Sequence, residues 1–175
     1  AQRNNVIAFV FAALVIVLVP LGMAAANWKL SPTKLDLFVW HKSLGMVVLA
    51  LMVVRIAWRL TTTAPSPPAS IPPLQRHAAR IVHTVLYVLL VLLPVSGWIV
   101  SSAANVPFRI FRVIPAPAVA LPDPVLAARA AGVHAALCVV LVLLLAIHVA
   151  AALRHHFVDR DEVLTRMLPG QGDRR

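Results

Sequence analysis

Cysteine and charge are both scarce in this sequence. Its one cysteine, Cys138, lies within an apolar stretch, which excludes a disulfide framework and a cysteine-based metal cluster. Charged residues make up 13% of the chain, whereas a soluble domain carries roughly 25%. Hydrophobic residues account for 61%, and the mean hydropathy is +0.87. This composition predicts an integral membrane protein rather than a soluble one.

Acidic residues are especially few, since 6 Asp and Glu stand against 16 Lys and Arg, for a net charge of +10. In a soluble protein this excess would suggest a nucleic-acid partner. Here the basic residues flank apolar stretches, where they suit anionic lipid headgroups and set the topology. We therefore expect membrane lipid, and no nucleic acid, around a single domain that covers residues 1–175.

Four apolar stretches have about the ~20 residues that a helix needs to span a bilayer. They cover about 6–26, 37–60, 81–101 and 126–153. The first is too long and too apolar for a cleavable signal peptide. Together they predict an all-α integral membrane protein, folded as an up-down four-helix bundle.

The segments outside these spans differ in composition. The connection 61–75 is rich in proline and predicts an extended strap. The connection 103–124 combines proline with aromatic and basic residues, which suits a segment lying on the membrane surface. The charged tail, 154–175, is expected to contain a short helix at 161–168.

The basic residues predict the orientation in the membrane. The end that holds both termini carries ten of them, and the other end carries six: Lys29, Lys34, Lys42, Arg109, Arg112 and Arg129. This bias predicts that both termini and the tail lie in the cytoplasm. The six outer residues either concentrate a small anion through their field or are scattered interfacial charges.

Two histidines, His134 and His148, lie fourteen residues apart in the last apolar stretch. At ~100° per residue this separation returns to nearly the same helix face, and at ~1.5 Å rise per residue it covers about 21 Å. One imidazole is therefore expected near each membrane surface. Imidazole is an axial ligand of haem iron, so the spacing suits two haems stacked across a membrane.

The partner expected for His134 is His41, which opens the second span at the same depth. Small residues flank both histidines, and they either admit a flat macrocycle or allow close helix packing. Because ionisable residues inside spans are uncommon and usually functional, we expect this pair to ligate haem. The alternative is a pair of interfacial histidines without a cofactor.

The partner of His148 is less evident, because the first span contains no histidine. The other candidate at this depth is His83, at the start of the third span. It is either the second iron ligand, a quinone contact or an interfacial histidine that faces water.

Further polar residues are expected at the same end of the bundle as His148. His155 and His156 follow the fourth span, either as solvated residues or as groups that handle protons or contact a quinone. Arg55 lies fourteen residues after His41 on the same helix face. It suits a haem propionate or a quinone carbonyl, unless its side chain reaches water at the helix end.

In combination these residues resemble the bacterial cytochrome b561 family, the superoxide oxidase type of di-haem membrane cytochrome. The resemblance covers all four spans. The segments that carry it are His41-Lys-Ser-Leu-Gly-Met, Leu51-Met-Val-Val-Arg55, His83-Thr-Val-Leu-Tyr-Val-Leu-Leu, Pro94-Val-Ser-Gly97, His134, Ile147-His148-Val-Ala-Ala-Ala-Leu-Arg-His155-His156 and Leu164-Thr-Arg-Met-Leu-Pro169.

The resemblance implies two b-type haems between the helices. His41 and His134 would hold the outer haem, and His148 would hold the inner one with a histidine of the first helix. At the corresponding position this sequence reads Ala8-Phe9, so one inner ligand is missing. The inner haem is then five-coordinate, takes His83 instead, or is absent.

The resemblance also implies an oxidoreductase of the bacterial inner membrane, which oxidises superoxide at the outer face and reduces ubiquinone near the inner face. Its cofactor would be haem b, for which His41, His134 and His148 are the ligands that this sequence retains. Two alternatives stay open. One is a cytochrome b subunit that links a partner dehydrogenase to quinone, and the other is a haem-poor membrane interaction protein.

Overall fold

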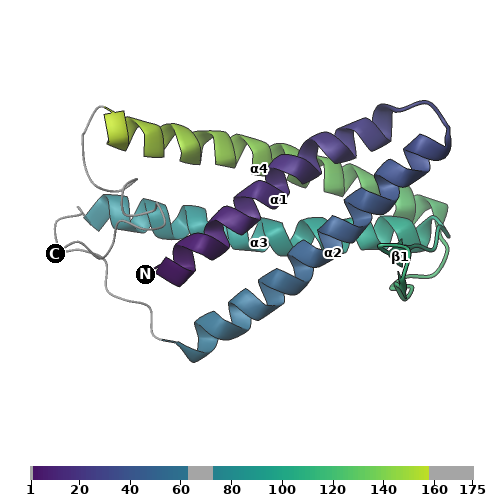
Figure 1. Ribbon diagram of the computed structural model, residues 1–175, viewed down its shortest axis with the longest axis horizontal. Coiled ribbons are helices and arrows are strands. Elements are labelled where there is room, and N and C mark those ends of the chain that lie inside the picture. The colour runs from purple at the N-terminus through teal and green to yellow at the C-terminus, as the bar shows by residue number, and fades with distance from the viewer. Residues whose placement is uncertain (1, 63–72, 158–175) are drawn as a thin grey trace.

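Four long helices run up and down through the molecule. The computed structural model describes residues 2–62 and 73–157, without the side chains of 2–6, 75, 152 and 155–157. The helices are α1 (Gln2–Asn27), α2 (Pro32–Thr61), α3 (Pro73–Ala103) and α4 (Pro124–Phe157). Each contains a segment long and apolar enough to cross a membrane. Figure 1 shows α1 beginning and α4 ending at the same end of the molecule, and the predicted all-α membrane four-helix bundle is confirmed.

The helices α2 and α4 begin in the same way. Ser31 precedes Pro32, and its hydroxyl accepts a hydrogen bond from the Lys34 backbone N–H at 3.3 Å. Asp123 precedes Pro124 and accepts from two backbone N–H groups at 2.8 and 3.1 Å. A capping side chain followed by proline fixes a helix start, because the first turn has backbone donors without helical partners. These caps place His41 and His134 about ten residues into their helices.

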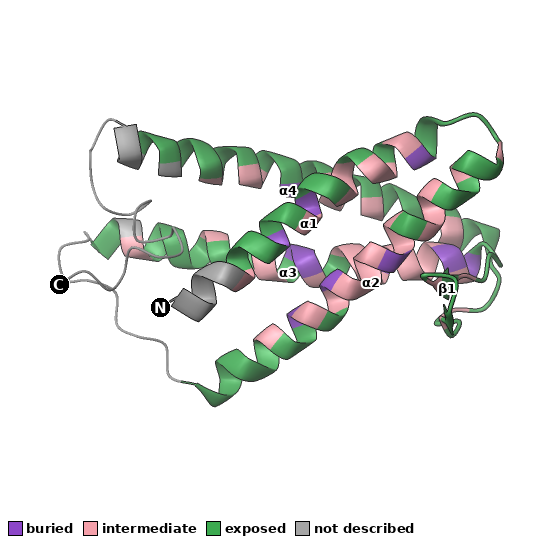
Figure 2. Ribbon diagram, viewed as in Figure 1, coloured by how far each residue is buried: buried purple, intermediate pink, exposed green. Residues whose placement is uncertain are grey.

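The packed core lies midway along the bundle. It consists of large apolar side chains from all four helices: Phe11, Val15, Val48, Met52, Leu89, Leu90 and Leu141. Much of the remaining apolar surface is exposed (Figure 2), as suits helices whose outer faces meet lipid tails. On α4, Leu141 lies midway between His134 and His148, so the core separates two histidine levels.

A small β-hairpin, which the sequence did not predict, lies between α3 and α4. Strands β1 (Arg109–Ile110) and β2 (Ile114–Pro115) pair antiparallel. At its turn, the backbone N–H of Phe111 donates to the hydroxyl of Ser43, a fully buried residue of α2, at 2.8 Å. The connection is therefore docked on α2, and is more than the membrane-surface segment that its composition suggested. The short helix expected at 161–168, and most of the strap 61–75, lie outside the described residues.

Candidate functional site

The structure brings four histidines together as two pairs, one toward each end of the bundle. The rings of His41 on α2 and His134 on α4 have centroids 6.2 Å apart and planes at 81°. The rings of His83 on α3 and His148 on α4 have centroids 5.7 Å apart and planes at 63°. The first pair is the one that the sequence suggested. In the second pair the ring neighbour of His148 is His83, a residue for which the sequence left three roles open.

His41 and His134 are here named the outer pair, and His83 and His148 the inner pair, after the membrane face that the basic residues predict for each. Backbone carbonyls hold both rings of the outer pair. Nδ1 of His41 lies 3.1 Å from the carbonyl oxygen of Leu18 on α1. Nδ1 of His134 lies 3.0 Å from the carbonyl oxygen of Leu93 on α3. A carbonyl oxygen only accepts, so Nδ1 carries the proton in each neutral ring and Nε2 keeps its lone pair. This is the tautomer in which a histidine ligates metal through Nε2.

Two glycines leave the space that these rings occupy. Gly22 and Gly97 each lie four residues after the carbonyl that a histidine contacts, in the next turn of the same helix face. A Cβ on Gly22 would lie 2.6 Å from Cε1 of His41, and a Cβ on Gly97 would lie 3.2 Å from Cε1 of His134. Any larger residue would press on the ring, so both positions determine how closely the histidines approach the supporting helices.

The sequence reasoning gave no role to these supporting residues. Besides the glycines, it missed Ser96, whose hydroxyl donates to the Leu93 carbonyl at 2.8 Å and lies 3.0 Å from Nδ1 of His134. A signal was present in two short segments, Leu18-Val-Pro-Leu-Gly22 and Leu93-Pro-Val-Ser-Gly97. Each segment begins with a leucine, contains a proline and ends with a glycine four residues after that leucine. The two segments lie on α1 and α3, the helices that support the outer pair.

The outer pair fits the two axial positions of a haem iron. Two imidazoles bonded in line to one metal, each at about 2 Å, have ring centres about 6 Å apart. The observed 6.2 Å matches this spacing. Among residues 2–62 and 73–157, no three or more His, Cys, Asp or Glu side chains gather to hold a metal ion. A pair of histidines therefore suits a metal whose other ligands come with it, as iron does in a porphyrin.

The inner pair has cationic and phenolic neighbours. Nη2 of Arg55 on α2 lies 3.4 Å from the hydroxyl of Tyr87 on α3. The guanidinium of Arg59 lies 5.4 Å from the centre of the same ring. Tyr87 follows His83 by one helical turn. This end of the bundle therefore gathers two guanidinium groups, a phenol and two imidazoles, the groups that suit an anionic or carbonyl ligand.

The remaining histidines are exposed or have side chains outside the described residues. His77 is exposed, and its Nδ1 lies 3.0 Å from the carbonyl oxygen of Pro73 on its own helix. The side chains of His155 and His156 lie outside the described part of the chain.

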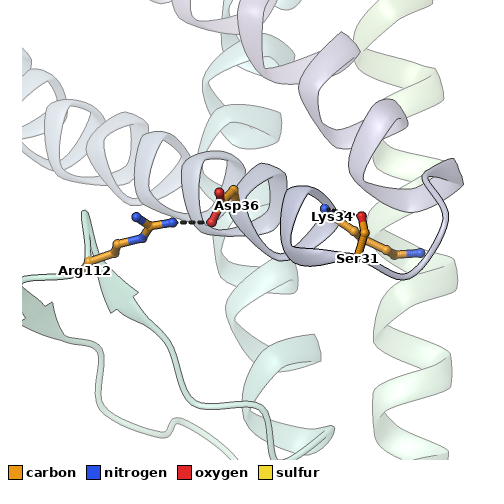
Figure 3. Close-up of polar contacts among 4 residues, drawn as sticks. All are labelled: Ser31, Lys34, Asp36 and Arg112. Carbon is orange, nitrogen blue, oxygen red and sulfur yellow. Dashed lines mark hydrogen bonds and ion pairs between the residues drawn. The ribbon is translucent and has the colours of Figure 1, made fainter.

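Several outer basic residues make local structural contacts. Arg112 pairs with Asp36 at the start of α2 (Figure 3). Lys34 donates to the carbonyls of Ala26 and Trp28, at 3.2 and 3.0 Å, and so caps the end of α1. Arg109 closes its own hairpin by donating to a carbonyl oxygen of the turn at 2.8 Å. These contacts favour a structural role for the three residues. They argue against the hypothesis that all six outer basic residues act together to concentrate an anion.

Lys42 differs from these residues because it directly follows His41 in the sequence. Its Nζ lies 5.8 Å from the centre of the Phe38 ring and 5.3 Å from that of Phe108. Cations within about 6 Å of an aromatic face are attracted to it. The two rings therefore hold one positive charge beside the outer histidine pair.

Known proteins are similar to this sequence over most of its length. The family described as prokaryotic cytochrome b561 matches residues 9–170. The protein named cytochrome b561 homolog 2 of Escherichia coli K12 is 37% identical over 128 residues, which cover 73% of this chain and 68% of that protein. Cytochrome b561 homolog 1 of the same strain is 30% identical over 152 residues, or 85% of each chain. A Yersinia pestis protein named probable superoxide oxidase CybB is 30% identical over 129 residues, covering 74% of this chain and 73% of its own.

Proposed function

Because the chain belongs to the prokaryotic cytochrome b561 family, we propose that it oxidises superoxide at the outer membrane face and passes the electrons to ubiquinone near the inner face. Family membership makes it a multi-pass bacterial membrane protein of oxidoreductase type, which transfers electrons through haem b. The two substrates, and the residues assigned to each step, are our proposal.

The arrangement of His41 and His134 is the observation that carries this function. Their ring separation of 6.2 Å suits two axial ligands of one iron. Their Nδ1 atoms are engaged by backbone carbonyls, which orients each ring and leaves Nε2 for the metal. His41 and His134 would hold haem b, which would supply reversible one-electron transfer at this end of the bundle. An electron donor then needs only to approach this end of the bundle.

Lys42 is the residue that we assign to the donor. Superoxide is a small anion, and the ammonium group of Lys42 lies beside His41, held between two aromatic rings. A fixed positive charge raises the local concentration of an anion and its rate of encounter. The name of the Yersinia pestis relative, probable superoxide oxidase, supports this donor. Each superoxide loses one electron and leaves as oxygen, with no nucleophile or base required.

We assign Arg55, His155 and His156 to the acceptor end. Ubiquinone takes up two electrons, from two superoxide anions, together with two protons. Histidine exchanges protons near neutral pH and suits that supply. The guanidinium of Arg55, directed at the Tyr87 hydroxyl, is placed to donate a hydrogen bond to a carbonyl oxygen at this end.

The same proposal orients the chain with both termini in the cytoplasm. In the sequence, ten of the 16 Lys and Arg residues occur near the two chain ends and around the connection 61–75, and six occur around the connections 28–31 and 103–124. Basic residues accumulate on the cytoplasmic side of membrane proteins. The His41–His134 pair then lies near the outer face, where superoxide arrives, and the His83–His148 pair lies near the cytoplasm.

The experiment is a pulse of superoxide added to purified wild-type protein in detergent, with reduction followed at the haem α-band. We expect rapid reduction, abolished by superoxide dismutase, and reoxidation when a short-chain ubiquinone is added. His77→Ala serves as the matched control for His41→Ala, because His77 is exposed and its Nδ1 lies 3.0 Å from a carbonyl oxygen of its own helix. His41→Ala should lose the outer haem and the response to superoxide, and His77→Ala should keep both.

Three results would contradict the proposal in different ways. Protein without an α-band would leave only a haem-poor membrane protein. A normal α-band that superoxide does not reduce, but a partner dehydrogenase does, would make the chain a subunit of a larger complex. An unchanged haem content in His41→Ala would show that the outer ligands lie elsewhere.

A further inference from the structure

The inner histidine pair joins helices different from those that the sequence resemblance implies. His148 on α4 has His83 on α3 as its ring neighbour, at 5.7 Å between centroids. The helix α1, which would supply the other inner ligand, contains no histidine in its sequence. In place of that ligand the chain reads Ala8-Phe9, and the imidazole at matching depth is on α3.

The two histidine pairs have closely similar geometry. Ring centroids are 6.2 Å apart in the outer pair and 5.7 Å apart in the inner pair, a difference of 0.5 Å. Both pairs are steeply inclined, with ring planes at 81° and 63°. In-line ligation of one metal by two imidazoles needs ring centres about 6 Å apart. The inner pair therefore meets the same spacing requirement as the outer one with only a small outward shift of its rings.

The surroundings of the inner pair leave it accessible to a large group. His83 is exposed and His148 is half-buried. Both lie toward the end of the bundle where α1 begins, beyond the packed core that begins at Leu89 and Leu90 on α3. Figure 1 shows α3 and α4 drawing apart toward the end where α1 begins.

The charges near His83 suit the acidic groups of a haem. Arg59 is close enough to His83 to interact with it electrostatically, and its guanidinium lies 5.4 Å from the centre of the Tyr87 ring, one turn further along α3. Guanidinium groups bind carboxylates with charge-assisted hydrogen bonds. The propionates of a haem are carboxylates, so cations at this end fit a bound macrocycle.

From this geometry we infer that His83 replaces the missing first-helix histidine as the second axial ligand of an inner haem b. The chain then binds its inner haem between α3 and α4, with His83 and His148 on the iron. This inference rests on the proposed function, since it requires a haem protein, but it does not depend on which donor or acceptor the protein uses. His83 is then an iron ligand, and quinone protonation is left to other groups.

Haem stoichiometry and spin state test the inference without any activity measurement. Purified wild-type protein should hold two low-spin haems per chain. His83→Gly should lose one of them or convert it to a high-spin form, seen by electron paramagnetic resonance. Added imidazole should return that haem to the low-spin form by filling the space of the deleted ring. His77→Gly, at an exposed histidine of the same helix that contacts the Pro73 carbonyl instead, should change neither the haem count nor the spin state.

A second variant keeps the test decisive if His83→Gly loses both haems by misfolding. Methionine is also an axial ligand, and it raises the reduction potential of the haem it binds. His83→Met should keep two haems, raise the midpoint potential of one and leave the other unchanged. Two unchanged potentials would overturn the inference, because a merely structural residue would not alter iron electronics.

The outcomes separate this inference from the proposed function. One haem per chain in the wild type, lost in His41→Ala and kept in His83→Gly, would defeat the inference alone. Two low-spin haems in His83→Gly without imidazole would do the same. Two haems with the expected His83 dependence, but no response to superoxide, would defeat only the proposed donor. A wild type without haem would defeat both.

Discussion

A Cβ on Gly22 would lie 2.6 Å from Cε1 of His41, closer than carbon atoms approach in folded proteins. The absence of a side chain at this one position of α1 is what lets the imidazole of α2 reach the Leu18 carbonyl. The same relationship recurs, less tightly, between Gly97 and His134. The outer pair is therefore supported by two helices that contribute neither of its histidines.

Gly22→Ala should displace His41 from its carbonyl and lower the outer-haem content. Overpacking of this kind costs about 1–3 kcal/mol, only partly offset by the ~1 kcal/mol by which alanine favours a helix over glycine. The α-band and the thermal unfolding midpoint check both effects. Gly132→Ala is the control, because a Cβ there meets nothing within 4 Å. Gly97→Ala, at 3.2 Å, should fall between them, and equal behaviour of all three variants would refute the steric role.

His41→Ala and His134→Ala should each remove the same haem, and the double variant should remove no more. The effects of substitutions at two residues that bind one group are not additive, whereas the effects of substitutions at separate sites add. The measurement is haem per chain together with the reduced-minus-oxidised spectrum of the three variants. If the two single variants lost different haems, the pairing across α2 and α4 would be wrong.

Ser43→Ala should release the turn of the β-hairpin from α2. The change leaves the Phe111 N–H without the acceptor that it has at 2.8 Å, at a cost of about 1–3 kcal/mol if that donor stays buried. Hydrogen exchange at the Phe111 amide should become faster. The Val119 amide is the internal control, because it donates to Ser102 elsewhere in the same connection. Unchanged exchange at Phe111 would mean that other contacts hold the turn.

Arg55→Gln should raise KM for a short-chain ubiquinone while haem content stays the same. The substitution removes a charged hydrogen-bond donor near the inner pair. In that region little water competes for the hydrogen bond to the quinone carbonyl. Steady-state reoxidation kinetics at varied quinone concentration give the measurement. Arg80→Gln is the control, since Arg80 is an exposed basic residue at the same end. A fall in haem content with KM unchanged would instead assign Arg55 to a haem propionate.

Much of the outer site could be predicted from the sequence, but its support could not. Fourteen-residue spacing on one helix, with His41 at the same depth, was enough to expect the pair. The contacts of His41 and His134 with carbonyls of α1 and α3 depend on how far each helix is rotated about its axis. Rotation is set by packing between helices distant in sequence, so no local pattern reports it.

The sequence by itself determined the number of helices, their apolar lengths and the two depths at which histidines occur. These follow from local properties, because a bilayer requires about twenty apolar residues with internally satisfied backbone hydrogen bonds. The tertiary structure alone decided which residues meet at each depth. It set glycines of α1 and α3 against the outer rings, docked the hairpin on Ser43, and turned His148 toward His83. Such choices depend on side-chain packing between neighbouring helices, which hydropathy and helical period leave open.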